Sequence, residues 1–268
     1  MVVSASADKT IRVWNESTGQ LVVNLVGHSD SVGGLALLDE TSLVSGSKEI
    51  IIWNTTDWSM VKMLKGHTGL SYGLAVLLNN CLASGSHDST IKIWDLNSGT
   101  ILREMKATGP SSVVYNIVLL KNNSQLASSY WDGVIRVWDY DTGRLVQELF
   151  GHTNRVFQLR LLENGNLISC SDDNTIKIWR QNAGMWRLNQ TLTGHTGGVT
   201  SLKVSLTGNP ISGSRDKSIK IWDLENGKVI QTIPAFTSEV WSLLVLNQNK
   251  IMSGSSSGQI RVWNSKPV

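Results

Sequence analysis

The sequence is poor in residues that mark several classes of protein. Its 268 residues include two cysteines, Cys81 and Cys170, and four prolines. The two cysteines lie 89 positions apart within apolar runs, so we interpret them as buried, reduced thiols rather than as a disulfide framework. This composition excludes a collagenous, disordered or disulfide-dense chain.

Long apolar runs are also missing. No stretch approaches the roughly 18 consecutive apolar residues of a membrane-spanning helix, and the opening MVVSASADKT lacks the charged-then-apolar order of a secretory signal. We therefore expect an intracellular protein, in the cytoplasm, the nucleus or both, with no membrane partner.

Neither sign of charge dominates. Lysine and arginine number 24 against 21 aspartates and glutamates, which gives a net charge of +3, and the basic residues are scattered along the chain. Nucleic-acid-binding domains usually carry a basic cluster or a pI above about 9. The charge pattern therefore does not favour a nucleic-acid partner. RNA binding is the weakest alternative function for this chain.

What the sequence does contain is an internal repeat. Segments such as SGSHDSTIKIWD and SGSRDKSIKIWD recur seven times, each ending in a strand that carries tryptophan. These tryptophans are Trp14, Trp53, Trp94, Trp138, Trp179, Trp222 and Trp263. Their spacings of 39, 41, 44, 41, 43 and 41 residues match the roughly 40–45 residues of a four-stranded propeller blade.

Each period reads as four short strands bounded by turns, for example VTSLKV, NPISGS, SIKIW and KVIQTI. Helical periodicity is absent, and Gly, Asn, Asp and Ser collect between the apolar runs. The sequence thus predicts an all-β fold, a seven-bladed β-propeller, with residues 1–268 as a single domain. The first blade lacks its innermost strand and the last its outermost, so we expect incomplete ring closure and a chain that is a fragment of a longer protein.

The Gly-His and Trp-Asp markers, their spacing and their number resemble the WD-repeat family over essentially the whole chain. The resemblance implies a structural tetrad of His, Ser, Asp and Trp in each complete blade. Three blades contain all four residues: His67, Ser84, Asp88 and Trp94; His152, Ser169, Asp173 and Trp179; His195, Ser212, Asp216 and Trp222.

The other blades depart from this pattern. The second has His28, Ser45 and Trp53 without the aspartate, and the fourth has Pro110 at the histidine position. The seventh keeps only Ser253 and Trp263.

The tetrads account for most of the residues that would suggest an enzyme. A Ser-His-Asp set resembles a hydrolase triad, but four of the five histidines occupy tetrad positions and only His87 is left over. One histidine and two distant cysteines match no metal-ligand spacing. We therefore predict a non-enzymatic protein with no catalytic residue, metal, cofactor or small-molecule substrate.

Function is then expected on exposed loops at the ends of the blades. In the family, the residue before the tetrad aspartate and the residues that open each innermost strand face the end most often used for binding. Aromatic and arginine side chains at these positions have the composition of an interaction hot spot. The predicted partner-binding residues are Tyr72, His87, Tyr115, Trp131, Arg155, Phe157, Asp172, Arg215, Glu239 and Trp241. Alternatively, Tyr72, Tyr115, Phe157 and Trp241 only fill space between blades.

The segment GHTNRVFQL is similar to two subgroups of the family. One comprises F-box ubiquitin-ligase adaptors, whose arginines bind phosphorylated degrons, and Arg215 falls on such a site. The other comprises scaffolds of histone methyltransferase complexes, whose aromatic residues sandwich an arginine. We expect a scaffold that binds proteins or peptides with a basic or phosphorylated anchor. Recognition of a phosphorylated degron is the alternative function. Of the two anchors, we favour the basic one because aromatic residues outnumber arginines at these positions.

Overall fold

The computed structural model describes residues 1–108, 112–121, 124–247 and 250–264. The described residues form 26 β-strands and no helix. The strands make seven antiparallel sheets, each built from consecutive strands of the chain. The predicted all-β fold with seven blades is therefore confirmed, and the first and last sheets have three strands where the other five have four.

The strands of the first four sheets have these bounds: β1 Val2–Ala5, β2 Ile11–Trp14 and β3 Leu21–Leu25; β4 Gly34–Asp39, β5 Ser42–Gly46, β6 Ile50–Asn54 and β7 Met60–Leu64; β8 Ser71–Val76, β9 Cys81–Ser86, β10 Thr90–Asp95 and β11 Ile101–Lys106; β12 Val114–Leu119, β13 Gln125–Tyr130, β14 Ile135–Asp139 and β15 Arg144–Leu149. The remaining sheets comprise β16 Val156–Leu161, β17 Leu167–Ser171, β18 Ile176–Asn182 and β19 Met185–Leu192; β20 Val199–Val204, β21 Pro210–Ser214, β22 Ser218–Trp222 and β23 Val229–Pro234; β24 Val240–Asn247, β25 Lys250–Ser255 and β26 Ile260–Asn264.

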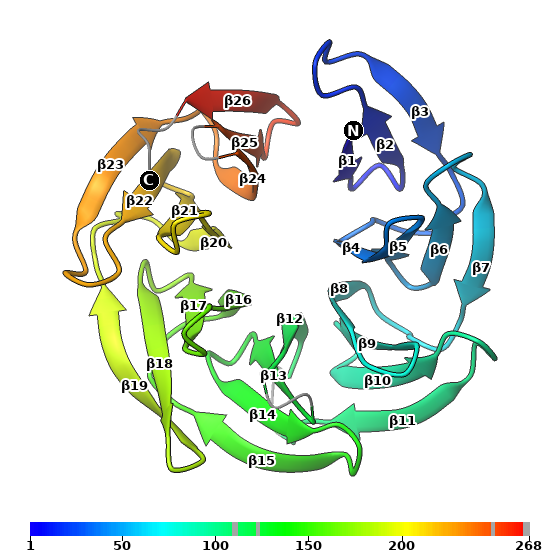
Figure 1. Cartoon of the computed structure of the whole chain (residues 1–268), viewed down its shortest axis with the longest axis horizontal. Coiled ribbons are helices and arrows are strands. Elements are labelled where there is room, and N and C mark those ends of the chain that lie inside the picture. Colours follow the sequence, from blue (N-terminus) through cyan, green and yellow to red (C-terminus); the bar gives the residue numbers. More distant parts are fainter. Residues whose placement is uncertain (109–111, 122–123, 248–249, 265–268) are drawn as a thin grey trace. The chain divides into compact units, whose positions relative to one another are not determined.

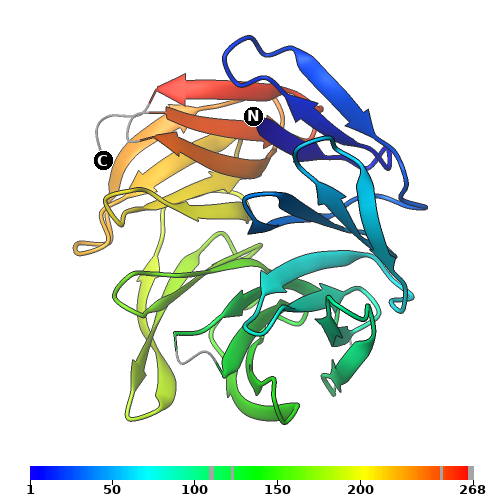
Figure 2. The ribbon, with the colours of Figure 1, turned by 45° about the vertical axis from the view of Figure 1, so that its right-hand side comes forward.

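The chain divides into two compact units. The first contains residues 1–128 and 138–144, and the second contains residues 129–137 and 145–268. The division runs through β13, β14 and the first residue of β15. Figure 1 shows the strands of each sheet in chain order, and the turned view of Figure 2 shows β24, β25 and β26 lying side by side. The prediction of a single domain stays a prediction.

Burial along the strands follows their place in the sheet. The central strand β10 is buried at every position from Thr90 to Trp94, whereas the outer strand β11 buries only Met105. A central strand is covered by neighbours on both edges and by packing on both faces, so it favours continuous β-branched and apolar residues.

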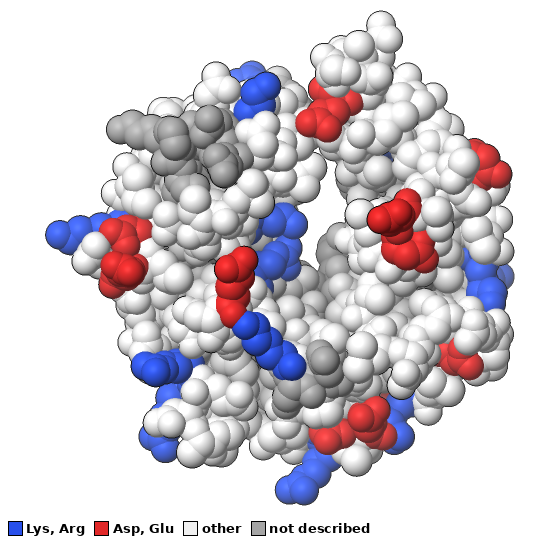
Figure 3. Space-filling view, viewed as in Figure 1, with Lys and Arg blue, Asp and Glu red and all other residues white. Residues whose placement is uncertain are grey.

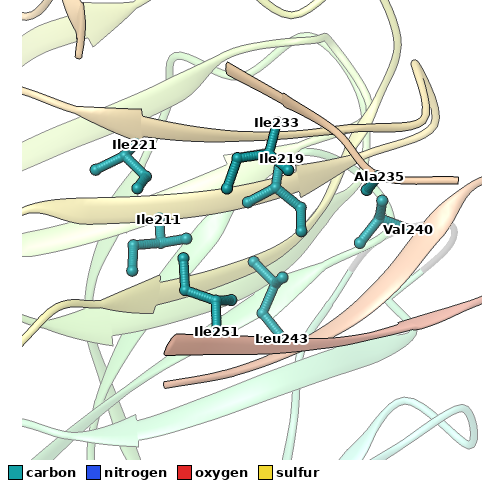
Figure 4. Close-up of a cluster of buried hydrophobic side chains, with 8 residues drawn as sticks. All are labelled: Ile211, Ile219, Ile221, Ile233, Ala235, Val240, Leu243 and Ile251. Atoms are coloured by element: carbon teal, nitrogen blue, oxygen red, sulfur yellow. The ribbon is translucent and has the colours of Figure 1, made fainter. Parts of the chain in front are cut away.

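The cores lie between the faces of successive sheets. In the second unit, Ile211, Ile219 and Ile221 pack toward Val240 and Leu243 of the next sheet, all at most 5% exposed. Figure 4 shows these side chains pointing toward one another from the two sheets. Burying such aliphatic side chains is the main favourable contribution to folding.

The last sheet has no fourth strand within the residues that the structure describes. Ile260 and Val262 of β26 are 42% and 49% exposed, while Ile219 and Ile221 occupy the same positions of β22 and are fully buried. In the preceding sheet, β23 covers this edge. The exposed apolar residues of β26 thus follow from the three-stranded sheet.

Candidate functional site

One hydrogen bond recurs in all seven sheets. The indole N–H of each repeat tryptophan donates to a serine hydroxyl of the preceding strand, over 2.7–2.9 Å. The pairs are Trp14–Ser4, Trp53–Ser45, Trp94–Ser84, Trp138–Ser128, Trp179–Ser169, Trp222–Ser212 and Trp263–Ser253. This bond supplies the buried indole N–H with the acceptor that it needs.

Three sheets contain a complete tetrad. His67 lies 2.8 Å from Asp88 through Nδ1 and 2.7 Å from Ser84 through Nε2, and Ser84 accepts from Trp94. The sets at His152 and His195 repeat this arrangement with distances of 2.6–2.8 Å. The structure thus brings the twelve residues together in three sets of four.

The tetrad carboxylates are held in their charged form. Burial alone would raise the pKa of Asp173, but hydrogen bonds from His152 and Thr175 hold it well below its ordinary value. The pKa values of Asp88 and Asp216 are lowered in the same way by hydrogen bonds from their histidines. Burial also lowers the pKa of His152, which keeps its ring neutral. Each of the three tetrad serines is fully buried and bonds both an indole and an imidazole.

In the second sheet a glutamate approaches the histidine that lacks an aspartate, but Nδ1 of His28 has no hydrogen-bond partner among the described residues. Glu49 accepts a hydrogen bond from the Ser29 hydroxyl at 2.6 Å, and its other oxygen lies 3.9 Å from Nδ1 of His28. The extra methylene lets the carboxylate of Glu49 approach His28 across the shortened turn. Sequence reasoning missed this residue because it looked for aspartate.

The fourth sheet uses an arginine where a histidine is absent. The buried Arg136 bonds Asp132 at 2.8 Å and Glu148 at 2.9 Å, and its guanidinium lies over the ring of Tyr130 at 4.4 Å. Two carboxylates and an aromatic face compensate the burial of this charge. Pro110, at the histidine position, lies outside the described residues.

Three of the predicted partner-binding residues form an aromatic cluster in the first unit. The rings of Tyr72 and His87 stack with centroids 4.7 Å apart, and Tyr115 meets both of them at 5.7–6.1 Å. Burial raises the pKa of Tyr72 and lowers that of His87, so both are neutral near pH 7. All three residues are half-buried. The cluster packs the ends of β8 and β12 and presents little open aromatic face.

Five other predicted residues form a continuous stack in the second unit, which we call the arginine–aromatic stack. Its members alternate between aromatic rings and guanidinium groups in the order Trp131, Arg155, Phe157, Arg215 and Trp241. Arg155 lies 4.5 Å from the centre of Trp131 and 5.3 Å from that of Phe157. Arg215 lies 5.6 Å from Phe157 and 5.4 Å from Trp241. Each such contact contributes about 0.5–2 kcal/mol, depending on desolvation.

Asp172 joins the two arginines of the stack. Its Oδ2 accepts from Nε of Arg155 at 2.9 Å, and its Oδ1 lies 3.3 Å from Nε of Arg215 without hydrogen-bond alignment. Gly198 makes room for this carboxylate, because a Cβ there would lie 2.0 Å from Oδ1. One aspartate thus orients both guanidinium groups.

The backbone fixes the turns from which these side chains project. The amide of Asp172 donates to the carbonyl of Arg155 at 3.0 Å, and the amide of Arg215 donates to that of Gly198 at 2.9 Å. Each bond ties the turn before a tetrad aspartate to the loop that opens the innermost strand. The tetrad and the stack are therefore built on the same two loops of each sheet.

The stack is open at its two ends and closed in its middle. Trp131 and Trp241 are 44% and 42% exposed, whereas Phe157 is 7% exposed beneath its neighbours. Phe157 therefore supports the arginines, and the open aromatic surface belongs to the tryptophans. Glu239 is half-buried, and within the described part of the chain no hydrogen bond or ion pair joins its side chain to the stack.

Across the residues that the structure places, no group of three or more His, Cys, Asp or Glu could hold a metal ion. Over the same residues, no helix is long and apolar enough to cross a membrane.

Comparison with protein families identifies most of these sheets. The family model described as WD domain, G-beta repeat matches residues 1–15, 58–95, 99–139, 143–180, 186–223 and 227–264. No curated protein matches the chain. In the second sheet, strands β4, β5 and β6 fall between the matched ranges, and β7 lies within the range 58–95.

Proposed function

Because the chain belongs to the WD-repeat family, whose members are typically non-enzymatic interaction scaffolds, we propose that it binds a peptide or an exposed loop of a partner protein on the arginine–aromatic stack. The observation that carries this proposal is the pair of tryptophans, Trp131 and Trp241, more than two-fifths exposed at the ends of an ordered stack.

Exposed tryptophans that are already held in place suit binding. Cation–π contacts with Arg155 and Arg215 order the two rings before any partner arrives. A partner that covers them gains the burial of a large aromatic surface while little side-chain entropy remains to be lost. Tryptophan and arginine are also the residues that most often dominate interface energies.

The charge of the stack favours an acidic anchor on the partner. Its two arginines face one carboxylate, Asp172, so the stack carries one positive charge in excess. The aromatic faces already hold the chain's own guanidinium groups, which leaves less room for a basic side chain than the sequence suggested. A carboxylate or phosphate of the partner would meet the arginine forks in a favourable geometry.

Selection from a displayed library of random peptides tests the proposal. The full chain is immobilised, enriched peptides are synthesised, and their dissociation constants are measured for wild type and for Trp131→Ala and Trp241→Ala. We expect enrichment of acidic sequences and a loss of about tenfold or more in affinity for each variant, as for interface hot-spot residues.

Phe150→Ala is the matched control, because Phe150 is 68% exposed in the same unit but lies outside the stack. Its affinities should equal those of wild type. Peptides that bind both tryptophan variants as tightly as wild type would refute the proposed site, and enrichment of basic sequences would refute the acidic anchor alone.

A further inference from the structure

Two basic residues lie on the innermost strands of neighbouring sheets in the second unit, outside the arginine–aromatic stack. Arg160 lies on β16 and Lys203 on β20, and both are half-buried. Figure 3 shows lysine and arginine side chains at the inner edge of this unit, beside β20. The two residues occupy the same position in their sheets. Arg160 pairs with Ile168 and Lys203 pairs with Ile211, and each of these isoleucines directly precedes the tetrad serine of its strand.

The other sheets show what this position usually holds. The corresponding residues there are Ala36, Ala75 and Leu244, from the same pairing with the second strand. A small or aliphatic residue therefore satisfies the architecture. The charges of Arg160 and Lys203 are not a requirement of the fold.

The two cations approach one another through a shared contact. Oε1 of Gln158 accepts from the amide of Leu202 at 2.9 Å and from Nη2 of Arg160 at 3.3 Å. The guanidinium of Arg160 is thus held toward the segment of β20 that carries Lys203. Burial, and after it the charge of Arg160, lower the pKa of Lys203 to about 8.

No carboxylate balances this pair within the described ranges. The guanidinium of Arg160 bonds the carbonyl of Leu159 at 2.7 Å and the amide of Gln158, and the ammonium of Lys203 has no hydrogen bond or ion pair there. Half-buried charges in proteins are normally paired, because desolvation penalises an isolated ion. Two like charges side by side add repulsion to this penalty.

We propose that Arg160 and Lys203 form a binding site for a small phosphate-bearing anion at the inner edge of the sheets begun by β16 and β20. A phosphate group carries close to two negative charges near pH 7 and offers several acceptor oxygens. The fork of Arg160 and the ammonium of Lys203 would each donate to it, and its charge would neutralise both cations. The partial exposure of both side chains gives a small solute access.

Calorimetric titration with inorganic pyrophosphate at constant ionic strength tests this site in the full chain. The variants are Arg160→Ala and Lys203→Ala, since alanine occupies the same position in two other sheets. Lys220→Ala is the control, because it removes the same charge from the same sheet at a lysine bonded to Thr232. Thermal unfolding of each variant verifies that it is folded.

We expect wild type and Lys220→Ala to bind pyrophosphate equally, and each site variant to lose affinity by about tenfold or more, the effect of one charge-assisted hydrogen bond. Sulfate, whose charge is constant, should bind more weakly at pH 9.5 than at pH 7 in wild type but not in Lys203→Ala. No binding by wild type, or equal binding by wild type and both site variants, would overturn the proposal.

Discussion

Nδ1 of His195 lies 2.6 Å from Oδ2 of Asp216, and the opposite ring nitrogen lies 2.7 Å from the hydroxyl of Ser212. The carboxylate of Asp216 is charged and can only accept, so the ring hydrogen on Nδ1 of His195 is directed to it. The indole of Trp222 donates to Ser212, Ser212 donates to His195, and His195 donates to Asp216. Removal of Asp216 therefore affects the hydrogen bonds of His195, Ser212 and Trp222.

Asp216→Ala is expected to lower the free energy of unfolding by about 1–3 kcal/mol, because it leaves the buried histidine without its acceptor. The same carboxylate also accepts from the amides of Thr196 and Ser218, which would lose their partner. Urea denaturation measures the change. Glu225→Ala, at an exposed position of the turn after Trp222, should change stability little, and an equal loss in both variants would contradict a special role of the tetrad.

The pH dependence of stability follows from the same groups. The tetrad aspartates have lower pKa values folded than unfolded, so unfolding favours their protonation and stability falls as the pH drops below about 4. Burial lowers the pKa of His28 and His152 below 6.5, so protonation of these rings also favours the unfolded chain. As the pH falls from 7, we expect a first decrease in the free energy of unfolding below about pH 6.5 and a steeper one below about pH 4.

Urea denaturation at pH 8, 7, 5.5 and 4 checks this profile. If the free energy of unfolding increased from pH 7 to pH 5.5, the histidines would have a higher pKa in the folded chain than in the unfolded chain, which would contradict this prediction.

The fold could be predicted from the sequence because it depends on a repeated pattern. Seven tryptophan strands at intervals of about 41 residues set the number of sheets, and three complete tetrads fixed the pairing of their strands. The residues found where a tetrad member is missing could not be predicted in this way. Glu49 and Arg136 act through side-chain reach and through partners from other strands, which no spacing rule contains.

The candidate site was predictable in membership but not in arrangement. Alignment of the repeats placed Trp131 and Arg215 in the turn before the tetrad aspartate. It placed Phe157 and Trp241 at the same position of the innermost strand, with Arg155 as a candidate for the surrounding rim. It did not indicate that the arginines would cover the aromatic faces, because this depends on how Asp172 orients them. The same alignment could have revealed Arg160 and Lys203, had charge been compared at every position of the innermost strand.

The unequal burial of two equivalent isoleucines gives a direct test of the three-stranded last sheet. Ile219→Ala removes a fully buried side chain and should cost about 2–5 kcal/mol of the free energy of unfolding. Ile260→Ala changes a residue that is 42% exposed and should cost less than about 1 kcal/mol. Denaturation with urea compares them, and similar losses would mean that β26 is covered in solution.

The last prediction concerns Gly198, which lies against Asp172. An alanine Cβ would stand 2.0 Å from Oδ1 and 3.1 Å from Cα of Asp172, so Gly198→Ala must displace the carboxylate that orients Arg155 and Arg215. We expect a loss of about 1–3 kcal/mol of the free energy of unfolding, typical of overpacking, and a change in tryptophan fluorescence as the stack loosens. Asp172→Ala in the same chain removes the clashing atom, so the double variant should lose less stability than the sum of the two single variants. Additive losses would show that the carboxylate does not depend on the space left by Gly198.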